Sequence, residues 1–451
     1  MARKTTSFRV GRVRGDLRGQ VWYLTYHENG KRHRSRSGQD LAEAKKLASQ
    51  INVQLETGVP AVLSFDSISI DDLRTRWLDH HEHVTRSSVH TIKRYRSATQ
   101  HLINFLSQHR VPQVTAQFRL EHAEQFARYL RTLEVTPNGH PHSISRPLLD
   151  KGVLYILHCC RSLFNFAIKR RHLPPYSDNP FSNLEFDRMS VEDSKPIILF
   201  TSDQEMRFLQ HCDDWQVSLF LTLMLTGMRP GEMTHLLLPD DVNFEQSVLQ
   251  INNRPQLGWQ IKTRIAREIP LVNELCQILQ HITRERSSGT LLQRRQFAEN
   301  TRQIENPIPA NMERELQQRL VVQKTDEPTG LDRVARLRIC RTVWRDAGAI
   351  KIEQVRSEFI RVCERAGLQG FTSPKMLRHL FATTLQDANV DPLIRCELMG
   401  HSTANQSSSH NLGMTANYTH TRFETKRKQL QFALDSRAAT AFAREWLQQH
   451  A

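Results

Sequence analysis

Arg229 stands in a sequence context that suits the binding of a fixed anion. It lies in the segment TGMRPGE, which follows the apolar run VSLFLTLM and places the arginine directly before a proline. The apolar run predicts a buried helix that ends at Thr226-Gly227, so the next turn lies at the edge of a hydrophobic core. A guanidinium is always charged and matches two oxygens of one anion. That anion is either a bound phosphate or the nearby carboxylate of Glu232, which would instead orient the turn.

Three further clusters follow along the second half of the chain. Lys262 ends the stretch GWQIK and precedes the strand-like REIPLV. KMLRHLFATTL carries Arg378 and is followed by LMGHS with His401, and MTANYTHT carries Tyr418. Only one of the seven tyrosines lies beyond residue 176. A tyrosine-dependent reaction in this part of the chain therefore has only Tyr418 to use.

The four clusters, in this order, resemble the catalytic domain of the tyrosine recombinases, the phage integrase family. The family pattern is an arginine, a lysine on a β-hairpin, a His/Lys-x-x-Arg, a histidine or tryptophan in a Leu-Gly-His turn, and a nucleophilic tyrosine. The resemblance covers residues from about 195 to 425. It implies cutting and rejoining of DNA strands without ATP, a metal or another cofactor.

A phosphodiester resists attack because its own negative charge repels nucleophiles. Cleavage requires fixed cations around the non-bridging oxygens, where charge builds up in the transition state. The resemblance assigns this role to Arg229 and Arg378, and it makes Tyr418 the nucleophile. A free phenol has a pKa of about 10, so Tyr418 needs nearby cations or a base to attack at neutral pH.

Two lysines and a histidine complete the expected catalytic site. Lys262 would protonate the departing 5′ oxygen as the general acid, and Arg264 is its rival for that role. Lys375 stands where most family members have histidine, and it would hydrogen-bond the phosphate or accept the tyrosine proton. His401 would hydrogen-bond a non-bridging oxygen. His379 matches a position that mostly packs, so no chemical role is expected of it.

The composition favours a polyanionic partner. The 451 residues include 62 Lys and Arg against 47 Asp and Glu, a formal net charge of +15. Nucleic acid is the commonest partner for such a surplus, and an ordinary basic protein is the alternative. We expect no membrane span and no secretory signal, because no apolar run is long enough for a span and the basic N-terminus lacks the apolar stretch of a signal. Its seven cysteines show no zinc spacing. We expect a prokaryotic, cytoplasmic, nucleoid-associated protein without a metal site.

Residues 1–62 predict a small sheet-and-helix unit, which the resemblance identifies as an arm-type DNA-binding domain. The alternating stretch QVWYLTYHE turns at Asn29-Gly30 into the basic KRHRSRS, which predicts a β-hairpin, and a helix follows. No acidic residue occurs from Lys31 to Gln39. The basic strand is either a DNA-binding surface or an edge strand protected by charge. The expected DNA contacts are Lys31, Arg32, Arg34 and Arg36.

Residues 67–190 predict four amphipathic helices with basic outer faces, which the resemblance identifies as a helical, SAM-like core-binding domain. One basic face alone is usually just solvated. Beside the neighbouring units, however, these faces predict a bundle that clamps a duplex. The expected DNA contacts are Lys93, Arg94, Arg96, Lys169 and Arg170.

Residues 195–451 predict a mixed α+β catalytic domain with a small antiparallel sheet, over SVLQINN, GWQIKT and REIPLV. Residues from about 285 to 350 are charged and irregular, and we interpret them as an insertion with some helix and no assigned function. The C-terminal tail predicts a helix that packs in cis or on a neighbouring protomer. Its apolar stripe is Leu430, Phe432, Leu434, Ala438 and Phe442. The fold class is therefore multidomain and mainly α.

These features predict a site-specific DNA recombinase or integrase that acts through a 3′-phosphotyrosyl intermediate and integrates or excises a mobile element. Its expected partners are double-stranded DNA, three further protomers in a synaptic tetramer and an optional DNA-bending accessory protein. Two other functions stay open. One is a type IB topoisomerase, and the other is a non-catalytic DNA-binding protein with a decayed site.

Overall fold

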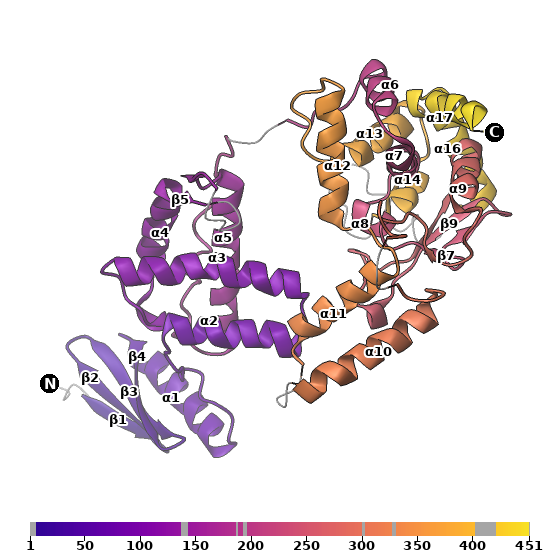
Figure 1. Ribbon diagram of the computed structural model, residues 1–451. Coiled ribbons are helices and arrows are strands. Elements are labelled where there is room, and N and C mark those ends of the chain that lie inside the picture. The colour runs from indigo at the N-terminus through magenta and orange to yellow at the C-terminus, as the bar shows by residue number, and fades with distance from the viewer. Residues whose placement is uncertain are drawn as a thin grey trace. The chain divides into compact units, whose positions relative to one another are not determined.

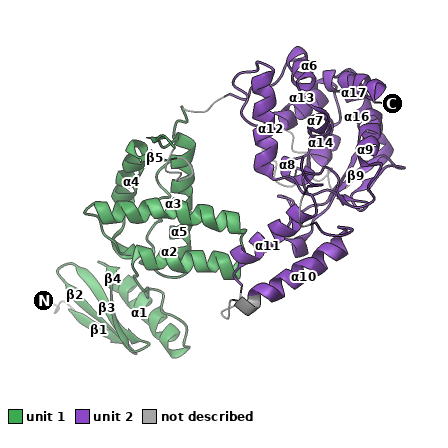
Figure 2. Cartoon of the chain, viewed as in Figure 1, with its two compact units in different colours: residues 1–195 green, residues 196–451 purple. Residues whose placement is uncertain are grey.

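The computed structural model describes residues 6–136, 143–185, 188–192, 196–299, 303–326, 331–401 and 421–450. The chain divides into two compact units, residues 1–195 and 196–451 (Figure 2). Both units are mainly helical and each contains a small antiparallel sheet, which confirms the predicted fold class (Figure 1). No helix of the described residues is both long and apolar enough to cross a membrane.

The first unit begins with a four-stranded antiparallel meander that is covered by one helix. Its elements are β1 (Ser7–Val10), β2 (Val13–Arg18), β3 (Val21–Glu28), β4 (Lys31–Gly38) and α1 (Leu41–Glu56). The predicted hairpin joins β3 to β4, and Asn29 and Gly30 both have the positive φ that a two-residue turn requires. Strands β1 and β2 were not predicted. Their sequence is rich in arginine and glycine, and Gly15 occupies a buried position because Phe8 fills the space of its missing side chain.

Four helices form the rest of the first unit: α2 (Ile70–Asp79), α3 (Val89–Gln108), α4 (Leu120–Thr132) and α5 (Asp150–Lys169). A π turn (His80–Val84) follows α2, and β5 (Glu134–Val135) pairs with β6 (Arg146–Pro147). Ser69 caps α2 by accepting the Asp72 N–H, and Leu73 and Trp77 are buried as their helical spacing predicts. The bundle has its own hydrophobic core, which includes Phe126 and Phe164.

The second unit opens with α6 (Ser202–Gln210), α7 (Asp214–Thr226) and α8 (Pro230–Met233), followed by β7 (Leu237–Leu238), β8 (Val242–Asn243), β9 (Val248–Ile251), β10 (Arg267–Pro270), α9 (Asn273–Thr283) and β11 (Gly289–Thr290). The three-stranded sheet has the order β10-β9-β8. SVLQINN and REIPLV hold strands as predicted. GWQIKT does not form the predicted strand. Only Trp259 makes an isolated bridge, because Gly258 adopts a left-handed conformation and residues 261–264 form a turn.

The remaining helices are α10 (Pro309–Asp326), α11 (Arg333–Asp346), α12 (Ile352–Arg365), α13 (Lys375–Asp387), α14 (Pro392–Met399), α16 (Phe423–Asp435) and α17 (Ala438–Gln449). Helices α10 and α11 lie within residues 285–350, which we interpret from the sequence as an insertion with some helix. They share a hydrophobic cluster that is separate from the main core of the unit and includes Met312, Leu316, Val343 and Trp344.

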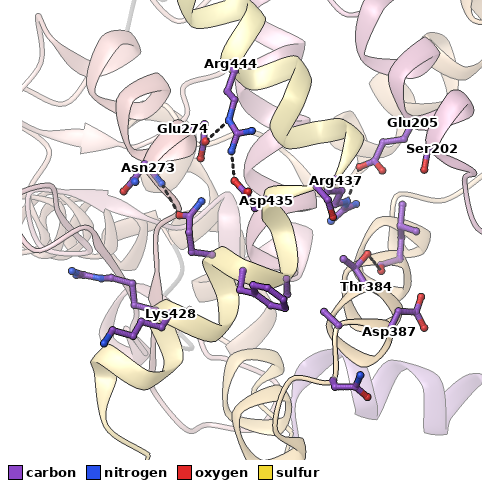
Figure 3. Close-up of a pocket in the computed structure, with 18 of the residues that line it drawn as sticks. Ser202, Glu205, Asn273, Glu274, Thr384, Asp387, Lys428, Asp435, Arg437 and Arg444 are labelled. Carbon is purple, nitrogen blue, oxygen red and sulfur yellow. Dashed lines mark hydrogen bonds and ion pairs between the residues drawn. The ribbon is translucent and has the colours of Figure 1, made fainter.

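The tail forms two helices that pack against their own unit. Leu430 and Leu434 enter its core, whereas Phe432 is 75% exposed, so the predicted apolar stripe is wrong at that position because 432 falls on the outer side of α16. Buried Arg437 starts α17 and pairs with Glu205 at 2.8 Å. Figure 3 shows Arg437 beside Glu205, and Arg444 between Glu274 and Asp435, around a hollow of about 1460 Å³. The lining of this hollow includes none of the candidate catalytic residues.

Candidate active site and nucleic-acid interface

Arg229 is held by its own turn. Helix α7 is buried on all sides and ends at Gly227, whose φ of 62° is left-handed and whose missing side chain leaves room for the ring of Phe381. Helix α8 begins three residues later, at Pro230. The Arg229 backbone N–H donates to Glu232 Oε2 at 2.9 Å, and its Nη1 donates to Oε1 at 2.8 Å. The carboxylate therefore fixes both the backbone and the head of the arginine, which remains partly exposed.

Glu232 is shared with a second arginine that the sequence did not single out. Arg267 of β10 donates from Nη2 to Glu232 Oε2 at 2.7 Å and from Nε to the Leu398 carbonyl at 3.0 Å. Burial raises the pKa of Glu232, but the hydrogen bonds and charge of Arg267, together with the hydrogen bonds of Arg229, outweigh it and the pKa is lowered overall. An ionised carboxylate between two guanidinium groups leaves one unit of positive charge uncompensated.

Arg378 lies on α13 and is oriented by two backbone carbonyls. Its Nη1 donates to the Gly227 carbonyl at 2.7 Å, and its Nη2 donates to the Met399 carbonyl. The same Nη2 lies 3.3 Å from His401 Nε2. Burial, followed by the charge of Arg229, lowers the pKa of Arg378 to about 10, so the guanidinium stays protonated at neutral pH.

His401 follows the left-handed cap of α14. Gly400 has a φ of 60°, and a Cβ there would lie 2.8 Å from Arg267 Nη1, so the missing side chain lets the arginine approach the turn. Burial and then the charges of Arg378, Arg229 and Arg267 lower the pKa of His401. The imidazole is therefore mostly neutral at pH 7. Arg229, Arg378 and His401 come from three segments and converge on one place.

Lys262 and Lys375 are exposed, and neither side chain forms a hydrogen bond or ion pair with a described member of this cluster. Lys262 lies in the turn 261–264, on the connection between β9 and β10, and Arg264 in the same turn has a φ of 61°. Lys375 is the first residue of α13, one turn before Arg378.

His379 is exposed rather than packed, because the buried residues of α13 lie on the opposite side of the helix. Tyr418 lies outside the described residues. The structure thus gathers three of the six candidate catalytic residues, places two at the surface of the same unit, and adds Glu232 and Arg267. No local pattern marked Arg267, since its partner is 35 residues away in the sequence.

The model of the phage integrase family matches residues 199–425, just over half of the chain, and this range includes all six candidate catalytic residues. The chain belongs to the phage integrase family. A search of curated proteins finds no significant match.

Among solved structures, the Tn1549 transposon integrase in complex with circular intermediate DNA is 19% identical, and the match covers 80% of this chain and 99% of that chain with a TM-score of 0.49. A lambda integrase tetramer bound to a Holliday junction is 14% identical, with 88% of this chain and 100% of that chain covered and a TM-score of 0.47.

The N-terminal sheet of this family member exposes one face that is dense in arginine. Paired residues of neighbouring strands lie on the same face, and the register links Arg9 to Arg14, Arg14 to Thr25, Thr25 to Arg34, and Tyr23 to Arg36. Trp22, Leu24 and Tyr26 point to the other face, towards α1. We call the exposed set the arginine face: Arg9, Arg14, Arg18, Arg32, Arg34 and Arg36.

The arginine face contains three of the four predicted DNA contacts of this unit and excludes the fourth. Lys31 has the opposite strand parity and lies 3.7 Å from Asp66, with which it forms an exposed ion pair. Arg34 lies over the ring of Tyr23 at 5.0 Å, and Arg14 pairs with Asp16 at 3.0 Å. Lys31 and Arg34 therefore make a matched pair of basic residues on opposite faces of one strand.

The predicted DNA contacts of the helical bundle are all exposed. Lys93, Arg94 and Arg96 lie on α3, and Lys169 and Arg170 lie at the end of α5. Arg94 lies over the ring of Tyr155 at 4.1 Å, and Arg170 lies over Phe166 at 5.4 Å. These rings limit the freedom of the two guanidinium groups without neutralising their charge.

Proposed function

We propose that this chain is an active site-specific DNA recombinase that cuts and rejoins strands through a covalent link between DNA and Tyr418. The observation that carries the proposal is the convergence of Arg229, Arg378 and a largely neutral His401. Such a group surrounds one phosphate with two permanent cations and one hydrogen-bonding imidazole. Both arginines are fixed before any substrate binds, so little reorganisation is needed when charge develops on the phosphate oxygens.

In the proposed cleavage step, the phenolic oxygen of Tyr418 attacks the phosphorus and forms a 3′-phosphotyrosyl bond. The bond between phosphorus and the 5′ oxygen breaks, and its electron pair stays on that oxygen, which takes a proton from Lys262. The phenolic proton leaves to a base, for which Lys375 and water are the candidates. Arg229, Arg378 and His401 stabilise the non-bridging oxygens throughout the step.

The proposed rejoining step is the reverse reaction with a different strand. A 5′ hydroxyl from a partner duplex attacks the phosphotyrosyl phosphorus and releases Tyr418. Because the bond energy is kept in the protein–DNA link, the exchange needs no ATP. Two duplexes carry four strands to be cut, which implies four protomers in the synaptic complex. Integration or excision of a mobile element in the nucleoid is the biological setting that this chemistry fits, and a DNA-bending protein is an optional partner.

The arginine face and the basic surfaces of α3 and α5 are the proposed DNA-binding surfaces that select the site. Phosphate contacts by Arg and Lys fix the register of a protein on a duplex. A row of arginines on an open sheet can enter the major groove, which admits a β-ribbon and exposes the edges of the bases.

The decisive experiment uses DNA that flanks the gene, prepared as nicked duplexes in which the fragment released with the new 5′ hydroxyl is short and diffuses away. Cleavage then traps the covalent intermediate, which is seen as a denaturant-resistant protein–DNA adduct. We expect an adduct with the wild type and none with Tyr418→Phe. Tyr176→Phe serves as the matched control, since Tyr176 is exposed and lies outside the catalytic unit. An adduct that persists in Tyr418→Phe would refute the assignment of the nucleophile.

The two alternatives give different results in the same system. A type IB topoisomerase would relax supercoiled plasmid without site preference and would not exchange strands between duplexes. A non-catalytic binder would retard the duplexes in a gel but form no adduct with any of them. The paired arginines and His401 favour a working site over a decayed one, because an unused site has no need to keep them together.

A further inference from the structure

The helical pair α10–α11 has no role in the family pattern, yet it packs on the segment that carries Lys262. The pair lies between Lys262 and Arg378 in the sequence. Its hydrophobic cluster joins Met312 of α10 and Trp344 of α11 to Leu257, which belongs to the connection between β9 and β10. The insertion is therefore built onto a catalytic loop rather than attached at a remote surface.

The first contact is a hydrogen bond from α11 to this connection. Trp344 is 4% exposed, and its Nε1 donates to the Leu257 carbonyl at 3.0 Å. The next residue, Gly258, has a φ of 70°, and a Cβ there would lie 3.0 Å from Cys340 of α11. The turn and the helix thus fit closely, and a buried indole N–H that lost its acceptor would be costly.

The second contact is an aromatic cluster that also reaches α8. The His235 ring stacks on Trp259 with centroids 3.8 Å apart and contacts Trp344 edge-on at 4.5 Å. His235 Nδ1 lies 2.8 Å from the Gly231 carbonyl. Gly231 comes two residues after Arg229, and a Cβ there would lie 3.2 Å from the Trp259 ring. One cluster therefore joins α11, the Lys262 connection and the turn of Arg229.

The position of Lys262 depends on Trp259 through the backbone. Trp259 and Arg254 exchange two backbone hydrogen bonds of 3.0 Å each. The amide of Asn253 then holds both ends of the turn 261–264, with one bond to each end at 2.8 Å. Lys262 itself is exposed, so its position is set by this backbone framework and not by contacts of its own side chain.

We propose that Trp344 is a positioning residue, which fixes the hairpin connection against α8 so that Lys262 is in place to protonate the leaving 5′ oxygen. The inference rests on the proposed function, and it gives the inserted helices α10–α11 a task in that reaction. A general acid acts only within hydrogen-bonding reach of the oxygen it protonates. Arg229 and Arg378 keep their bonds to Glu232 and to backbone carbonyls without Trp344, so we expect loss of the Trp344 contact to misplace chiefly Lys262.

The test compares two nicked substrates that differ at one atom. One has the natural bridging 5′ oxygen and the other has sulfur there. A thiol has a pKa of about 8.5, far below that of an alcohol, so sulfur departs without a general acid. Any defect that arises from a missing or misplaced acid therefore disappears on the sulfur substrate, and a defect of phosphate binding does not.

The variant is Trp344→Phe, which keeps a ring but removes the donor to Leu257. We expect cleavage of the oxygen substrate to slow by about 10- to 100-fold and to return to the wild-type rate on sulfur, as for Lys262→Ala. The matched control is Trp215→Phe. Trp215 also donates its Nε1 to a backbone carbonyl, that of Gln293 at 2.7 Å, but it does not touch the connection. We expect this control to cleave both substrates normally.

Hydrogen exchange gives a readout that does not depend on cleavage. In Trp344→Phe, the backbone amides of residues 252–264 should exchange faster, because the bonds between Arg254 and Trp259 loosen. Unchanged exchange there would overturn the link between α11 and the connection, and so would an equal slowing on both substrates.

If Lys262→Ala is rescued by sulfur but Trp344→Phe cleaves normally, the inference fails and the proposed function stands. If the wild type forms no Tyr418-dependent adduct with either substrate, both fail.

Discussion

The catalytic unit and the N-terminal sheet use arginine in opposite ways. In the catalytic unit, Arg229, Arg267 and Arg378 each donate to a buried carboxylate or to backbone carbonyls. On the arginine face, six exposed arginines lie on one side of a sheet, and within the described part of the chain only one of them, Arg14, makes an ion pair. The same side chain is thus held by buried partners in one region and exposed to solvent in the other.

The difference follows from the task proposed for each region. Stabilising the charge that develops on one phosphate requires groups that are already in position, because moving them during the reaction adds to the barrier. Binding a polyanion depends mainly on how many phosphates are neutralised and how many counterions are released. A fixed arginine should therefore resist even a conservative replacement, and an exposed one should contribute a small, salt-dependent share.

The largest effect is expected for Arg378→Lys. Lysine keeps the charge but cannot donate to Gly227 and Met399 while also facing a phosphate. We expect adduct formation on the nicked substrate to fall by about 1000-fold, while duplex binding in a gel changes little. Arg356→Lys is the control, because Arg356 also donates to a carbonyl, that of Thr372, but is exposed. A mild defect in Arg378→Lys would show that charge alone is enough and would remove the contrast between the two regions.

Glu232→Gln tests how much the fixed arrangement contributes to the fold. The variant leaves Arg229 and Arg267 without their shared anion, and breaking a buried ion pair from one side usually costs about 3–5 kcal/mol. We expect a loss of about 4 kcal/mol in the free energy of unfolding, measured by urea with tryptophan fluorescence. The exposed pair Glu424–Arg427 is the control, and Glu424→Gln should change the value by less than about 0.5 kcal/mol. Equal effects would mean that Glu232 is not structurally special.

The sequence predicts the parts of both regions that depend on local signals. Asn29-Gly30 predicts the β3–β4 hairpin, because these two residues tolerate the positive φ of its turn. Gly227 ends α7 for the same reason. The positions of Arg229 and Arg378 follow from a motif that is read residue by residue. In each case, the information lies within a few residues of the feature it predicts.

The sequence does not predict features that depend on long-range pairing. The Gly227 carbonyl that orients Arg378 is 151 residues away, and the Arg267 partner of Glu232 is 35 residues away. Strands β1 and β2 are not predicted, because their arginines and glycines obscure the alternation of apolar and polar residues. Half of the arginine face lies on these two strands and is therefore not predicted either. The separation of Lys31 from Arg32, Arg34 and Arg36 is not predicted either, because a run that is basic at both parities does not show which residues share a face of the sheet.

Acid should weaken the catalytic unit more than the N-terminal sheet. Burial lowers the pKa of His235 to about 4; the hydrogen bond to the Gly231 carbonyl opposes this shift, and the charge of Arg254 adds a smaller lowering. In the unfolded chain His235 takes up a proton near pH 6.5, whereas in the folded chain it stays neutral down to about pH 4. The contribution of His235 to the free energy of unfolding is therefore complete above about pH 6.5 and is lost as the pH falls from about 6.5 to 4.

The expected loss is at most about 3 kcal/mol. His235→Gln should flatten this slope in urea unfolding, whereas His27→Gln, on the exposed sheet surface, should leave it unchanged. An unaltered slope in His235→Gln would assign the acid sensitivity to other groups, such as His401.

The smallest effect is expected on the arginine face. The matched pair Lys31 and Arg34 lies on one strand, so the two variants differ only in which face of the sheet loses a cation. Arg34→Ala removes one cation from the face, and Lys31→Ala removes one from the other side of β4. We expect Arg34→Ala to weaken binding to a duplex several-fold and to reduce the slope of log affinity against log salt by about 0.9, the value for one phosphate contact. Lys31→Ala should change neither quantity. If the two variants behave alike, only the net charge of the strand matters, and the sheet has no DNA-binding face.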